Sequence, residues 1–91
     1  MRNWWYIGTV VTLDRVQTGI RIDRTVLKVL KALAEYLDIS VGDLVEGVVL
    51  HAFEGRAPFS AETLRTVDQL RAVYGLALTA ADAHGVEEAG S

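Results

Sequence analysis

Apolar and polar positions alternate with helical spacing from about residue 24 to residue 55. The first helix is predicted to begin at Asp23 as its N-cap and to end near Leu37. Its polar residues are spaced four, three, four and three positions apart, so they form a stripe along one face. The stripe consists of Arg24, Lys28, Lys31, Glu35 and Asp38. Because the rest of the circumference is apolar, we expect more than one neighbour to bury this helix.

The second helix is predicted to follow a short link, with Ser40 as N-cap and Asp43 as a capping-box partner. Gly55 is expected to end it as the C′ residue. Gly47 lies mid-helix, where glycine costs about 1 kcal/mol relative to alanine, and close approach of another helix would compensate for it. The expected buried face contains Val41, Leu44, Val45, Val48, Val49, Ala52 and Phe53.

Residues 56–84 are predicted to form a C-terminal helical extension after a linker at residues 56–58. Ser60 is the expected N-cap, and Phe59 with Leu64 has the spacing of a hydrophobic staple. This third helix is expected to stop at Gly75 and to dock on the rest of the protein. Residues 85–91 are acidic and small, which is typical of a frayed tail.

The N-terminal part of the chain has the composition of extended structure. Residues 4–13 are rich in β-branched and aromatic side chains without a helical period. Apolar residues occupy odd positions before Arg15 and even positions after it, so we expect a break near Asp14. Residues 1–15 are therefore predicted to be an extended arm or an extra strand. A second strand would follow, with Gln17, Gly19 and Arg21 on its polar face.

The order of strand, helix, link and helix over residues 16–55 resembles the ribbon-helix-helix family, of the Arc, MetJ and CopG type. The run Ile39-Ser40-Val41-Gly42-Asp43-Leu44 matches the family's pattern at the start of the second helix. The resemblance covers 40 of the 91 residues. It implies a mostly α fold with a short β ribbon, built as an intertwined dimer. Here an extra N-terminal strand and a C-terminal helix would be added.

The resemblance also implies a DNA site. Gln17, Gly19 and Arg21 would face base edges in the major groove, where arginine suits guanine and glutamine suits adenine. Phosphate contacts would come from Arg24, Ser40, Val41 and Gly42, since free N–H groups and the helix dipole favour an anion. Gly19 brings no side chain to this face, and Asp43 adds a negative charge beside the phosphate site.

Charge and composition add two expectations. The net charge is −3, but residues 15–31 hold five basic residues against one acid, and residues 32–55 hold five acids and no lysine or arginine. The positive end of the chain is therefore where DNA would bind, or it is simply a solvated face. There is no cysteine, and a 40-residue unit buries too little apolar surface to fold alone. We therefore expect a homodimer.

Two functions follow. The first is a homodimeric DNA-binding transcriptional regulator that reads the major groove with a β ribbon. The resemblance also implies an antitoxin-like form of it, because antitoxins of this fold hold a toxin through a C-terminal segment. The alternative is a dimer repurposed for protein–protein interaction, with residues 56–91 docking a partner and the N-terminal strand covering the DNA face. The chain has no catalytic, cofactor or metal motif, so we do not expect an enzyme. Lacking a membrane-spanning run or a cleavage site, it is expected in the cytoplasm.

Overall fold

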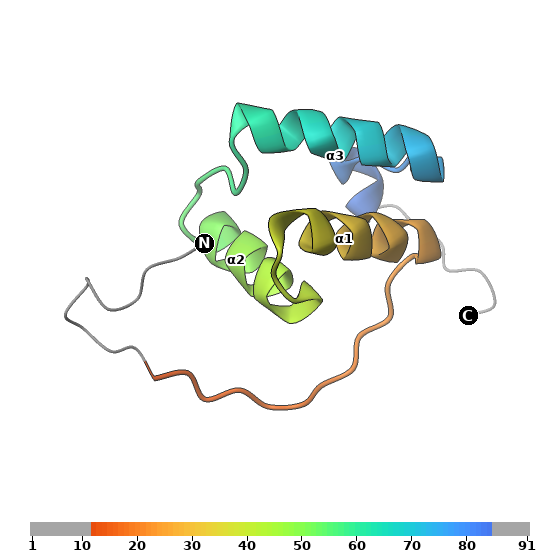
Figure 1. Cartoon of the computed structure of the whole chain (residues 1–91). Helices are drawn as coiled ribbons and strands as arrows, with labels where there is room; N and C mark the ends of the chain where they lie inside the picture. Colours follow the sequence, from red (N-terminus) through yellow and green to blue (C-terminus); the bar gives the residue numbers. More distant parts are fainter. Residues whose placement is uncertain (1–11, 85–91) are drawn as a thin grey trace.

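A computed structural model describes residues 12–84 of the chain. This part forms three α-helices, α1 (Arg24–Leu37), α2 (Val41–Phe53) and α3 (Ala61–Tyr74), followed by a short 3-10 helix, η1 (Ala80–His84). In Figure 1 α3 lies above α1, and residues 12–22 pass below α1 and α2. We call residues 12–22 the arm. The arm and α3 therefore lie on opposite sides of α1.

The three N-terminal caps expected from the sequence are confirmed. Each capping side chain accepts a hydrogen bond from a backbone N–H of the first turn, which would otherwise lack a partner. Asp23 accepts from Thr25 and Val26 at 3.0 and 3.1 Å. Ser40 accepts from the N–H of Asp43 at 3.0 Å, and Ser60 accepts from that of Thr63 at 3.1 Å.

The C-terminal ends of the helices use left-handed backbone. Gly55, after α2, and Gly75, after α3, both have φ of +69°, as their predicted roles require. At the end of α1 this conformation is taken by a residue with a side chain, Asp38, at φ 60°. Its N–H turns back to the carbonyls of Ala34 and Glu35. Asp38 therefore holds a conformation that glycine would adopt at lower cost.

This difference gives a paired prediction. Asp38→Gly should raise the free energy of unfolding by up to about 1 kcal/mol, because it relieves left-handed strain. Gly75→Ala should lower it by about 1–2 kcal/mol, because it introduces the same strain at φ +69°. Urea denaturation followed by circular dichroism measures both. Changes of the same sign would mean that one of these helix ends has a different conformation in solution.

The buried core is small and lies where α1 meets α2 and α3. Leu33, Ala34 and Leu44 form its buried cluster, and Val67 and Leu70 of α3 pack against it. Helix α1 contacts both α3 and α2. The expectation that more than one helix buries α1 is thus confirmed, with both neighbours coming from its own chain. The docking of α3 on the rest of the molecule is confirmed as well.

The predicted β ribbon is wrong for the part of the chain that the structure describes. Residues 12–22 are extended but form no strand, and their side chains are exposed. A strand exists only where a second strand accepts and donates its backbone hydrogen bonds, and alternation in the sequence does not supply that second strand. Of the predicted N-terminal strand, residues 12 and 13 are likewise not in a strand, and the remainder lies outside the described residues.

Two expectations about α2 also change. Nothing lies within 4 Å of the position that a Cβ would occupy at Gly47, so within the described chain no helix approaches it closely. Phe53 was expected in the core, but its side chain is 81% exposed. Both positions lie where no other helix of residues 12–84 packs against α2.

Candidate nucleic-acid interface

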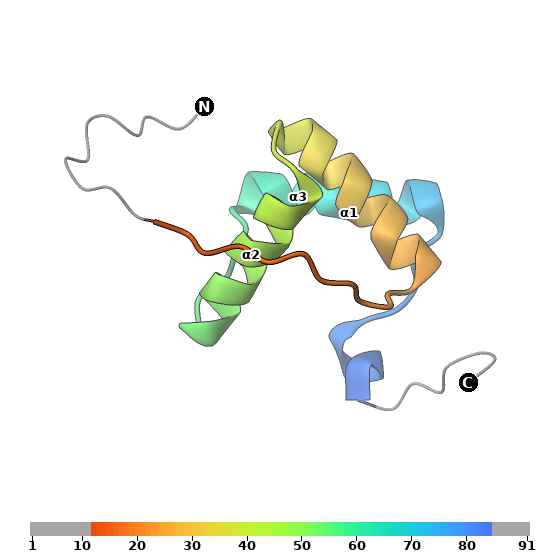
Figure 2. The same cartoon turned by 90° about the horizontal axis from the view of Figure 1, so that it is seen from below.

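The arm is attached to α2 by one arginine. Nη2 of Arg15 lies 2.9 Å from Oδ1 of Asp43 and 2.8 Å from Oε1 of Glu46. Its Nε donates a second hydrogen bond to Oε2 of Glu46 at 3.3 Å. Asp43 and Glu46 are three positions apart, so both lie on the same face of α2. Figure 2 shows the arm crossing α2.

These contacts change the electrostatics of α2 more than its stability. Hydrogen bonding to Glu46, together with the charges of Glu46 and Asp43, raises the pKa of Arg15. An arginine guanidinium is charged at any physiological pH, and here it partly offsets the two carboxylates. Because the Arg15 side chain is 56% exposed, the ion pairs are solvated and weaken as salt is added. In the sequence Arg15 belongs to the basic segment of residues 15–31. In the fold it pairs with Asp43 and Glu46 of the acidic segment, residues 32–55.

A row of cations lies along the exposed face of α1. Arg24, Lys28 and Lys31 are exposed and spaced four and three positions apart, which confirms the predicted polar stripe. None of the three forms an ion pair with a carboxylate of residues 12–84. We call these three residues the cationic row. Their charges add to one another along about two turns of helix, before Glu35 and Asp38 continue the stripe.

The predicted base-reading residues are all accessible. Gln17, Gly19 and Arg21 lie in the exposed arm, and Arg21 is three residues before the start of the cationic row. The apolar residues between them, Val16 and Ile20 among them, are exposed too. The arm therefore presents both of its faces to solvent and buries neither.

The predicted phosphate contacts fall into two groups. Ser40, Val41 and Gly42 open α2, where the first N–H groups of a helix have no intrahelical acceptor. Arg24 lies at the far end of α1, about 20 Å away by the rise of a 14-residue helix. The structure does not bring these four residues together. It does bring the arm to the start of α2, because Arg15 binds Asp43 one turn from Ser40.

Sequence reasoning missed three features of this region. Lys28 and Lys31 were recognised as a polar stripe but not as candidate phosphate contacts. Arg15 was not recognised as the residue that holds the arm, although the acids Asp43 and Glu46 at helical spacing were a usable signal. Exposure of apolar residues on α2 was missed as well, because the sequence does not reveal which helix lacks a neighbour. The exposed apolar residues of α2 are Val49, Leu50 and Phe53.

Comparisons with protein-family models, with curated proteins and with solved structures found no match to this chain. The fold and the site define a small three-helix protein with a cationic row on α1 and an extended, exposed arm. Within residues 12–84 no helix has the length and apolar character to cross a bilayer. The same residues contain no group of three potential metal-ligating side chains.

Proposed function

We propose that this protein is a homodimeric DNA-binding regulator that acts in the cytoplasm. The observation that carries the proposal is the cationic row, in which Arg24, Lys28 and Lys31 face solvent without an ion-pair partner among residues 12–84. Phosphate neutralisation by such side chains supplies most of the affinity in DNA binding. The net charge of −3 lowers the expected affinity, but the cationic row concentrates positive charge locally, and Arg15 pairs with the acids of α2 nearest the arm.

Self-association is supported by exposed apolar surface. Among residues 12–84 only four are buried, whereas large apolar side chains of the arm and of α2 are exposed. A second copy covering this surface would bury it and would bring two cationic rows into one assembly. The apolar residues concerned are Leu13, Val16, Ile20, Ile22, Val49, Leu50 and Phe53.

The arm would contribute sequence preference. Arg21 and Gln17 carry donors and acceptors that match guanine and adenine edges, and the exposed arm leaves them accessible to a groove. The N–H groups of Val41 and Gly42, beside Ser40, would donate hydrogen bonds to the oxygens of a phosphate. The negative charge of Asp43, which would repel that phosphate, is offset by Arg15. The cationic row would then position the duplex, and the arm would read it.

The test is a titration of labelled double-stranded genomic fragments at several salt concentrations. Each phosphate contact contributes about 0.9 to the slope of log affinity against log salt. In the homodimer Lys28→Gln together with Lys31→Gln removes four lysines, so it should weaken binding at every site and reduce the slope by about 3–4. Arg21→Ala should instead lose about 1–3 kcal/mol, mainly at preferred sites.

Arg65→Gln is the matched control, because Arg65 is an exposed arginine on α3, on the opposite side of α1 from the arm. It should leave both affinity and slope close to those of the wild type. Absence of binding at low salt would rule out the DNA function. So would equal losses in Arg65→Gln and in the lysine double variant, because the interaction would then depend on net charge alone.

A second candidate function is protein–protein interaction through the C-terminal region. It is favoured by exposed apolar residues on α3, where Val73 is 73% exposed and Leu64 and Tyr74 are also exposed. Surface of this kind commonly marks a contact with a partner. An antitoxin-like regulator would combine this contact with DNA binding. Two results together would support this function over the first. The protein would not bind DNA at low salt, and the Val73→Ser variant would lose binding to a protein partner.

A further inference from the structure

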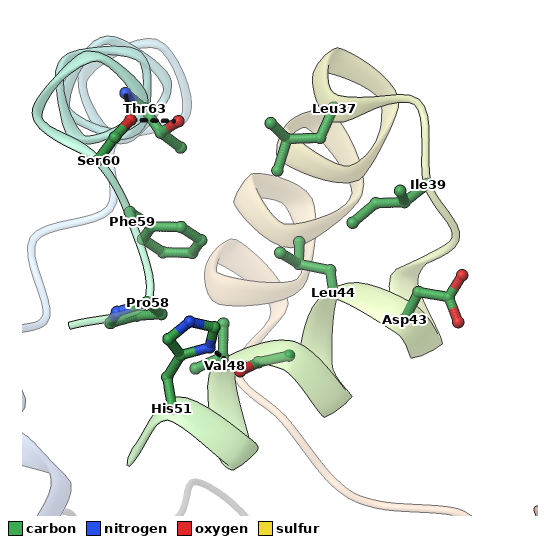
Figure 3. Close-up of a pocket in the computed structure, with 11 residues that line it drawn as sticks. Leu37, Ile39, Asp43, Leu44, Val48, His51, Pro58, Phe59, Ser60 and Thr63 are labelled. Carbon is green, nitrogen blue, oxygen red and sulfur yellow. Dashed lines mark hydrogen bonds between the residues drawn. The ribbon is translucent and has the colours of Figure 1, made fainter. Parts of the chain in front are cut away.

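An apolar groove lies between α2 and the beginning of α3. Its walls include Leu37 of α1, Leu44 and Val48 of α2, and Phe59 just before α3. Figure 3 shows these side chains converging, with the phenyl ring of Phe59 between α2 and the start of α3. The groove encloses about 260 Å³, and no described residue fills it. It is separate from the cationic row, which lies on another face of α1.

The size of the groove indicates the kind of group that it accepts. Sites for drug-sized ligands usually enclose about 300–1,000 Å³, so this groove of about 260 Å³ is small for a free ligand. A single large aromatic side chain is a better match. Such a side chain buries more apolar area than any other residue type and packs well against another ring, which Phe59 supplies here.

The groove also contains a hydrogen-bond acceptor. Nδ1 of His51 lies 2.7 Å from the carbonyl oxygen of Gly47. A carbonyl can only accept, so Nδ1 carries the proton and Nε2 of the neutral ring is an acceptor. In Figure 3 this second nitrogen is on the side of the ring nearer Phe59. A buried indole N–H needs such an acceptor, so the groove suits tryptophan better than phenylalanine.

The chain itself carries tryptophan about ten positions before Arg15 in the sequence. Its two tryptophans are Trp4 and Trp5, followed by Tyr6 and Ile7. Arg15 holds the arm at Asp43, which is also a residue of the groove wall. Ten residues separate Trp5 from Arg15, and an extended chain of that length reaches about 33–36 Å, more than the length of α2. A tether of this kind gives an effective concentration in the millimolar range.

We propose that the groove formed by Leu37, Leu44, Val48, His51 and Phe59 is a docking site for the chain's own aromatic N-terminal segment, residues 4–7. One indole occupies the groove, stacks on Phe59 and donates its N–H to Nε2 of His51. Arg15 sets the position from which the segment enters. The segment then covers apolar core residues that the three helices alone leave open. This inference does not depend on DNA binding.

Tryptophan fluorescence tests the proposal directly, because both tryptophans lie within the segment. In the full-length protein the emission should be blue-shifted relative to the urea-unfolded chain and protected from acrylamide. Gly47→Leu should shift the emission to the red and raise the quenching constant toward that of the unfolded chain. The reason is that Gly47 lines the groove and a side chain there meets open space. Ala52→Leu is the matched control, since Ala52 is exposed on the same helix and does not line the groove.

Three results would overturn the proposal. The first is wild-type emission equal to that of the unfolded chain, and the second is a blue shift that Gly47→Leu leaves unchanged. The third is a blue shift that disappears on dilution, which would assign the occupant to a second copy. Nuclear Overhauser effects give an independent reading that needs no variant. Contacts between indole protons and the ring of Phe59 or the methyls of Leu44 and Val48 are expected, and their absence in an assigned spectrum would also overturn it.

Discussion

Replacing Leu33 with alanine should lower the free energy of unfolding by about 2–5 kcal/mol, the largest effect expected of any single truncation within residues 12–84. Leu33 is 3% exposed and lies at the centre of the small cluster that joins α1, α2 and α3. A domain of this size is stable by only about 5–14 kcal/mol, at roughly 0.05–0.15 kcal/mol per residue. Loss of one central side chain therefore removes a large share of the total stability.

Chemical denaturation followed by circular dichroism measures this loss, and Lys31→Ala on the exposed face of α1 is the control, expected within about 0.5 kcal/mol. Leu30→Ala and Val48→Ala should fall between the two. Both side chains are partly buried at the edge of the cluster, so truncating them should cost less unfolding free energy than truncating a buried residue. Equal effects at Leu33 and Lys31 would show that the helix has a different rotation in solution.

The melting temperature should rise with protein concentration, because we propose that a second copy covers the apolar surface of the arm and α2. When dimerisation is coupled to folding, a tenfold increase in concentration adds about 1.4 kcal/mol to the apparent stability. For an assembly of this size that corresponds to roughly 3–6 °C per tenfold. Scanning calorimetry or thermal circular dichroism over two decades of concentration measures the shift.

The Phe53→Ser variant distinguishes a dimeric protein from a monomeric one. In a monomer the side chain of Phe53 is 81% exposed, so its removal should change stability by less than about 0.5 kcal/mol. In a dimer built on α2 the same substitution should lower the melting temperature and reduce its dependence on concentration. Val73→Ser, on α3, is the control and should have neither effect. A melt independent of concentration, with a monomer mass by light scattering, would contradict the homodimer.

The three helices were predictable because their signals are local. Asp23, Ser40 and Ser60 each bond to an N–H two or three residues away, and Gly55 and Gly75 supply left-handed backbone directly after a helix. Such interactions depend on neighbours in sequence, so the pattern of residues reveals them without knowledge of the fold. The positions of the helix ends matched for this reason.

The main error was the prediction that the arm forms a β-strand. A strand needs hydrogen bonds to a second strand that can be distant in the sequence. The alternation of apolar and polar residues from Val16 to Ile22 indicated which side chains share a face, but pairing requires a second strand that no described segment supplies. The resemblance to the ribbon-helix-helix family, and the roles of Gln17, Gly19 and Arg21 that it implies, stay predictions. The comparisons found no match that could carry them.

The sequence by itself determined the helices, their caps and the cationic row on α1, because each depends on contacts within a few residues along the chain. Only the tertiary structure decided that Arg15 pairs with Asp43 and Glu46, about thirty positions away, and so belongs electrostatically to α2. It alone showed that α1 is buried by α2 and α3 while Phe53 is left exposed. These outcomes depend on how whole helices pack, and the pattern along one helix does not specify its neighbours.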